Sequence, residues 1–191
     1  MRAPNKTAAL AAVLLLPLAA RADPAPPEEA HARGFTLGLM AVQPLPPWND
    51  AGFGLAPWAG FTLPVWQNLL ATARVGYIGH FEKTSTSGGS EGESIDYSSW
   101  ELPVILGVEY AFPGYRGFLF SAEFGYVLHQ SGAKYSHEPD TSSADHGAVL
   151  ALGAGYRIWR IEARVHLMVL GLPDPVKQKA VMFGVQWLLP I

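Results

Sequence analysis

The sequence has no cysteine, few charges and only one long apolar run. Without cysteine among its 191 residues, the chain cannot use disulfide bonds for stability. Charged residues make up 15% of it, against roughly 25% in ordinary soluble proteins. After its first segment, no uninterrupted apolar run reaches the roughly 20 residues that a membrane-spanning helix needs. These absences exclude a disulfide-stabilised secreted domain and a helical membrane protein.

The amino-terminal segment has the pattern of a secretory signal peptide. Arg2 and Lys6 precede an apolar stretch over residues 8–20, and Ala20-Arg21-Ala22 offers a small-x-small cleavage site. The stretch is too short for a membrane anchor and is broken by Pro17. We therefore predict a signal peptide over residues 1–22, cleavage before Asp23, and a flexible periplasmic leader over residues 23–33.

The charge balance of the predicted mature chain is acidic. Removing residues 1–22 takes three of the 13 basic residues and none of the acidic ones, which leaves ten Lys and Arg against 16 Asp and Glu. Nucleic acid is therefore excluded as a partner. No motif for a cofactor is present, and none is expected.

Alternation with a period of two dominates the rest of the chain. In residues 118–128 every even position is apolar, whereas Ser121, Glu123 and Gly125 stand at odd positions. A period of two indicates a strand with two different environments. Here the bulky aromatic face is the continuous one and the opposite face is small and polar, which indicates lipid outside.

Eight segments with strand character follow one another from Gly34 to Leu189. They are residues 34–42, 53–63, 69–83, 98–112, 117–129, 148–158, 161–172 and 180–189. Most have the roughly 9 to 11 residues of a tilted transmembrane strand. Only helices and closed barrels satisfy all backbone groups in lipid. The sequence therefore predicts an all-β fold, an eight-stranded antiparallel up-and-down transmembrane β-barrel over residues 34–191.

The connections between these segments differ in length. Residues 64–68, 113–116 and 159–160 form short turns, which contain Trp66, Tyr115 and Trp159. The longest of the others, residues 84–97 and 130–147, are polar. Outer-membrane barrels have short periplasmic turns, long outer loops and aromatic girdles. We expect four outer loops, with both chain ends on the periplasmic side.

The charged residues of the strands share one face. If the bulkier apolar set faces lipid, the inward residues are Arg74, Glu82, Glu101, Glu109, Glu123, Arg157, Glu162 and Arg164, with His80 and His166. An unpaired charge in a water-poor lumen is costly. We therefore expect an interior charge network of Arg74, Arg157 and Arg164 with Glu109, Glu123 and Glu162.

The inward glycines would make room for these long side chains. They are Gly76, Gly107, Gly125, Gly153, Gly155 and Gly184. The interior of an eight-stranded barrel is just wide enough for side chains. A filled structural core is the favoured interpretation, and a gated ion path is the alternative.

A family resemblance rests on this pattern and on sequences such as Glu101-Leu102-Pro103-Val104-Ile105-Leu106-Gly107-Val108-Glu109-Tyr110. The chain resembles the small eight-stranded outer-membrane β-barrel proteins of Gram-negative bacteria, of the OmpA-like barrel type. The resemblance implies a monomer in the outer membrane, in contact with lipid and lipopolysaccharide and inserted by the barrel assembly machinery. Such barrels end on an aromatic residue, whereas this chain ends on Pro190 and Ile191. Either Trp187 takes that place, or the chain inserts by another route.

Three other functions compete with this interpretation. His129-Gln130-Ser131, with Glu138 nearby, has the His-x-Ser spacing of a lipid A-modifying hydrolase, but both side chains would point inward, away from the acyl chains. A lipocalin-like soluble carrier of an apolar ligand would place the aromatic face inside and the charges outside. A metal site would draw on one loop that is rich in ligands, namely His129, His137, Glu138, Asp140, Asp145 and His146. That loop lacks the spacing of a known motif, so we predict no metal site.

The sequence therefore favours a non-enzymatic barrel with a charged, filled interior. Loops on a rigid scaffold are where binding function usually resides. We expect the outer loops to serve envelope structure or surface binding.

Overall fold

Ten antiparallel strands follow one another in the computed structural model, which describes residues 34–46, 52–86, 94–113, 117–135, 139–172 and 178–191. They are β1 (Gly34–Pro44), β2 (Gly54–Trp66), β3 (Leu69–Gly76), β4 (Ile78–His80), β5 (Lys83–Thr86), β6 (Ser94–Ala111), β7 (Phe118–Tyr135), β8 (Thr141–Ile158), β9 (Ile161–Leu172) and β10 (Gln178–Pro190). Within these ranges, no helix has the length and hydropathy to cross a membrane. The predicted signal peptide and leader lie outside the described residues.

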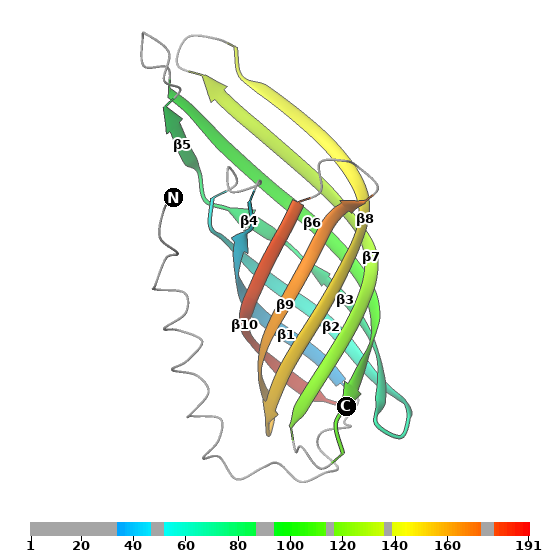
Figure 1. Ribbon diagram of the computed structural model, residues 1–191. Coiled ribbons are helices and arrows are strands. Elements are labelled where there is room, and N and C mark those ends of the chain that lie inside the picture. The colour runs from blue at the N-terminus through cyan, green and yellow to red at the C-terminus, as the bar shows by residue number, and fades with distance from the viewer. Residues whose placement is uncertain (1–33, 47–51, 87–93, 114–116, 136–138, 173–177) are drawn as a thin grey trace.

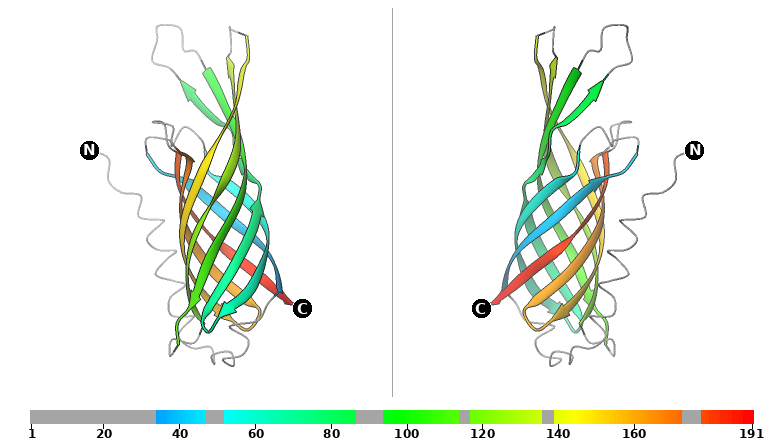
Figure 2. Two further views of the ribbon diagram at one scale, coloured as in Figure 1. Left: turned by 90° about the vertical axis from the view of Figure 1, so that its right-hand side faces the viewer. Right: turned by 90° about the vertical axis from the view of Figure 1, so that its left-hand side faces the viewer.

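The strands close into a barrel with eight strand positions around its circumference (Figures 1 and 2). We call each of these positions a stave. Each neighbouring pair is antiparallel, and β1 closes the barrel by pairing with both β2 and β10. β3, β4 and β5 pair successively along β6 and together form one stave. Gly34 lies opposite Pro190, so the barrel strands begin and end at the same end of the barrel. The predicted fold class is confirmed.

Three staves are longer than the sequence indicated. β6, β7 and β8 have 18 residues each, against 11 in β1 and 12 in β9. Much of the polar stretches 84–97 and 130–147, expected as loops, is therefore strand. Both faces of these extensions meet solvent, so their side chains carry no apolar alternation, while the backbone ladder continues from Val127 opposite Gly147 to Ala133 opposite Thr141. In Figure 1 the three staves rise well above the others.

The predicted strand over residues 69–83 is interrupted. The ladder to β6 stops at Gly79 and resumes at Lys83. Glu82, expected inside the barrel, stands in this interruption with 61% of its side chain exposed. Because the backbone leaves the ladder there, the period of two no longer decides where the side chain points.

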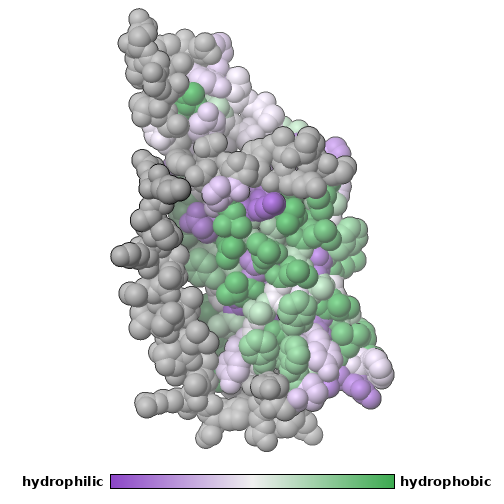
Figure 3. All heavy atoms as spheres, in the orientation of Figure 1, coloured by the Kyte–Doolittle hydropathy of each residue, from purple (hydrophilic) through white to green (hydrophobic). Residues whose placement is uncertain are grey.

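The outer surface of the barrel is a continuous apolar belt. Large apolar side chains are exposed all around it, including Leu106 at 62%, Phe124 at 62% and Val165 at 51%. Figure 3 shows hydrophobic residues gathered over the middle of the visible face. A patch of this size is far beyond what a soluble monomer exposes. The outward orientation expected for alternate residues is therefore confirmed at Val104, Leu106, Val108, Leu150, Leu152, Ala154, Val165 and Leu167.

Aromatic pairs border this belt at both ends. Near the long staves, Phe53 stacks on Phe81, and Tyr77 on Trp100. Near the short turns, the rings of Phe112 and Phe118 meet edge to face with centroids 5.7 Å apart. Trp66 and Trp159 are exposed at the same end, as expected, and Tyr115 lies outside the described residues. Aromatic girdles of this kind mark the two lipid–water interfaces.

Candidate functional site

The structure brings the six residues of the expected interior network together inside the barrel. Arg74 comes from β3, Glu109 from β6, Glu123 from β7 and Arg157 from β8, while Glu162 and Arg164 come from β9. Each of these side chains is at most 3% exposed. Three positive and three negative groups thus lie within one buried set, which we call the inner network.

Glu109 is the hub of the inner network. Its carboxylate accepts hydrogen bonds from Arg74 at 3.0 Å, from Arg157 at 3.2 Å, and from Arg164. Glu162 accepts from Arg157 at 2.7 Å and from Arg164, and Glu123 accepts from Arg74. Because every charge has a partner of opposite sign, the network meets the condition under which buried charges are tolerated.

Polar neighbours extend the inner network at its edges. The Gln186 side-chain amide donates to Glu162 at 2.9 Å. His166, also buried, lies 3.5 Å from Glu123. Neither residue was assigned to the network from the sequence, although His166 has the inward parity of Arg164 two residues earlier.

Some inward glycines face the long side chains across the ladder. Gly107 lies opposite Glu123, and Gly155 opposite Arg164. A Cβ added at Gly155 would lie 2.7 Å from a carboxylate oxygen of Glu162, so the space is already filled. Gly125 has a different role, because a Cβ there would lie 2.0 Å from the carbonyl oxygen of Val104. It permits close approach of two strands.

An apolar layer lies above the inner network and was not expected. Its thirteen side chains form one buried cluster: Met40, Val42, Ala56, Trp58, Ile78, Ile105, Val127, Val149, Ala151, Met168, Leu170, Ala180 and Met182. Along β9 the inward residues run from Glu162 and Arg164 at the turn to Met168 and Leu170 beyond them. The interior is therefore charged in its lower half and apolar above that, up to the level of Glu101, and the expectation of a small and polar inward face is wrong for this layer.

A second polar group, which we call the mouth cluster, lies beyond the apolar layer. The fully buried Glu101 carboxylate contacts His80 Nε2 at 3.0 Å and His129 Nδ1 at 3.2 Å. His80 Nδ1 also lies 2.8 Å from the carbonyl oxygen of Gly52. Glu101 thus ties three staves together where the barrel opens toward the long strands.

The residues of the hydrolase alternative already have other partners. His129 contacts Glu101, and the Ser131 hydroxyl lies 2.9 Å from that of Ser143. Both residues belong to β7 and have its inward parity, as expected, but they lie within a strand and not at the base of a loop. Glu138, the acidic residue of that alternative, lies outside the described residues.

The ligand-rich segment does not form a metal centre within the described ranges. Asp140, Asp145 and His146 are exposed, and no three described His, Cys, Asp or Glu side chains come together in a way that could hold an ion. His137 lies outside the described residues, as Glu138 does.

Comparisons with known proteins find similarity in structure alone. No protein-family model matches the chain, and no curated protein matches its sequence. Ail, the attachment invasion locus protein of Yersinia pestis, aligns with a TM-score of 0.55 and 9% identity, covering 82% of this chain and 97% of its own. The structure of Ail in complex with the heparin analogue sucrose octasulfate gives the same TM-score and identity, and the alignment covers 81% of this chain and 96% of that one. Neisserial surface protein A aligns with a TM-score of 0.50 and 9% identity, covering 82% of this chain and 97% of its own.

These neighbours are small outer-membrane β-barrels, and at 9% identity the likeness is one of fold. The expected resemblance to eight-stranded outer-membrane barrels is therefore confirmed at that level. Together with the apolar belt and the two girdles, the fold is that of an outer-membrane protein.

Proposed function

We propose that this protein is a non-enzymatic outer-membrane barrel that holds a rigid polar sheet above the membrane for binding at the cell surface. We call this the surface sheet: β5 with residues 94–100, 129–135 and 141–147 of β6, β7 and β8. The observation that carries the proposal is the ladder that continues through these extensions. On the order of 20 Å of strand is added by seven residues. A hydrogen-bonded sheet presents side chains in fixed positions, as binding requires.

The interior supports a scaffold in preference to a channel. Arg74, Arg157 and Arg164 are each ion-paired, so the inner network leaves no uncompensated charge to attract an ion. Above it, the side chains of the apolar layer offer a permeating ion no charge and no oxygen, and the Trp58 indole N–H is their one polar group. An ion crossing it would lose its hydration without replacement. We infer that the inner network and the layer stabilise the barrel and do not conduct.

We also propose how the chain reaches and contacts the membrane. Trp187 in β10 is 49% exposed and pairs with Leu37 and Ile161 in the closing staves. It is the aromatic residue available to the barrel assembly machinery near the chain end. The apolar belt would contact lipid acyl chains, and the upper girdle the lipopolysaccharide of the outer leaflet.

Single cysteines test the orientation, because the native chain has none. Ser142 lies in the surface sheet, and Arg160 in the short turn between β8 and β9; both are exposed. In intact Gram-negative cells, Ser142→Cys should react with a membrane-impermeant maleimide, whereas Arg160→Cys should react only after permeabilisation. The reverse pattern, or labelling of neither variant in permeabilised cells, would contradict the proposed function.

A further inference from the structure

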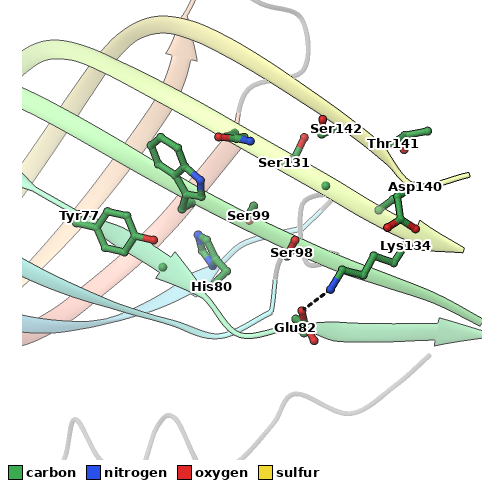
Figure 4. A pocket seen from close by; sticks show the side chains of 15 residues that line it. Tyr77, His80, Glu82, Ser98, Ser99, Ser131, Lys134, Asp140, Thr141 and Ser142 are labelled. Carbon is green, nitrogen blue, oxygen red and sulfur yellow. Dashed lines mark ion pairs between the residues drawn. The ribbon is translucent and has the colours of Figure 1, made fainter.

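A polar groove opens where β4 and β5 leave the ladder with β6. Gly79 is the last residue of β4 paired with β6, and pairing resumes at Lys83, so Ser98 and Ser99 have no ladder partner on that side. The groove has a volume of about 460 Å³, a size typical of small-molecule sites. In Figure 4, Tyr77 and His80 lie at one end, Ser98 and Ser99 along β6, and the side chains of β7 and β8 opposite.

The groove combines aromatic rings with hydroxyl and amide groups. Tyr77 and Trp100 both line it and stack with ring centroids 6.0 Å apart. Its uncharged polar lining comes from Ser98, Ser99, Gln130, Ser131, Thr141 and Ser142. Such groups both donate and accept hydrogen bonds. The Ser99 hydroxyl is buried and has no partner in the described part of the chain, so the groove holds an unused hydrogen-bonding group.

The charges around the groove nearly cancel. Glu82 lies 3.8 Å from Lys134 in an exposed ion pair, and Asp140 is a further acidic group of the lining. A polyanion needs an excess of positive groups, which this lining does not supply. The lining therefore differs from what a sulfated sugar, such as the one bound to Ail, would require.

We propose that this groove binds an uncharged saccharide. A pyranose ring has an apolar C–H face, which packs on an aromatic ring, and a rim of hydroxyl groups, which pair with serine, threonine and glutamine. The proposal deepens the proposed function and rests on it, because most of the residues that line the groove belong to the surface sheet. Neutral sugars of lipopolysaccharide in the same leaflet and glycans of another surface share this chemistry.

Saturation-transfer NMR on the full-length protein in phospholipid nanodiscs tests the proposal, with the neutral tetrasaccharide lacto-N-neotetraose as the probe. We expect saturable binding that weakens about tenfold in Trp100→Leu, since one aromatic contact is worth about that factor. The double variant Ser99→Ala with Gln130→Ala should weaken binding in the same direction while keeping both rings. Trp66→Leu, the same substitution at the opposite end of the barrel, is the matched control and should bind like the native protein.

Two further arms make the outcomes distinct. The first arm identifies the source of the bound sugar. Tetrasaccharide binding is measured in nanodiscs that contain lipopolysaccharide with its full polysaccharide, and in nanodiscs that contain a form truncated near lipid A. Competition by the full form alone indicates sugars of the same leaflet, and no competition indicates external glycans. Absence of tetrasaccharide binding, equal binding by Trp100→Leu and Trp66→Leu, or preferential binding of sucrose octasulfate would overturn the proposal. If Ser142→Cys is still labelled on intact cells, the proposed function survives that result.

Discussion

Replacing Glu109 with glutamine is expected to lower the free energy of unfolding by about 3 to 5 kcal/mol, the cost of removing one partner from a buried ion pair. The Glu109 carboxylate is fully buried and contacts three arginines. Glutamine keeps the size of the side chain but leaves the inner network with one uncompensated positive charge. Urea titration of the protein in phospholipid vesicles, followed by tryptophan fluorescence, measures the loss.

Glu82→Gln is the matched control for this change. The same substitution removes the same charge, but Glu82 is exposed and lies 3.8 Å from Lys134. Exposed pairs of this kind contribute about 0 to 1 kcal/mol. Equal effects of the two substitutions would mean that the charges inside the barrel are hydrated, and the account of a filled interior would be wrong.

Replacing Ala154 with arginine is expected to destabilise the folded barrel by up to about 2 to 4 kcal/mol, the cost of an arginine at the bilayer midplane, because the charge would lie within the lipid-facing belt. Ala154 is exposed on β8 and lies between Phe120 and Val165 of the neighbouring staves. The loss should appear as a smaller fraction of folded protein in the outer membrane and a lower urea midpoint in vesicles.

Ala144→Arg provides the comparison on the same strand. Ala144 has the same parity as Ala154 and is also exposed, but it lies in the surface sheet beyond the barrel. Arginine there remains in water, so its cost should be close to zero. If both substitutions had the same small effect, the surface around Ala154 would face water and not lipid.

The staves that cross the membrane could be predicted from the sequence because lipid imposes a strict period of two. Phe118, Phe120 and Phe124 are exposed, whereas Ser121 and Glu123 are buried. The inward parity of the six network residues followed from the same rule. Only the structure gives their partners, because the contacts of Glu109 depend on the register of staves that are distant in the sequence.

The surface sheet, the apolar layer and the position of Glu82 could not be predicted from the period of two. Solvent reaches both faces of the surface sheet, so residues 129–135 have the polar sequence of a loop although their backbone remains in the ladder. The apolar layer was missed because residues such as Val149 and Met168 are apolar inside a barrel that is also apolar outside. Where both faces are apolar, alternation disappears. Glu82 was misplaced because residues 69–83 were predicted as one continuous strand, although Gly79 stands where the ladder to β6 stops.

Membrane fractionation combined with gel electrophoresis of boiled and unboiled samples tests the central claim, that this chain is an outer-membrane barrel with its charges inside. The full-length protein, expressed in a Gram-negative host, should sediment with the outer membrane, and its folded band should shift on boiling. A soluble periplasmic protein without that shift would contradict the account, because the apolar belt could not then be the surface that faces lipid.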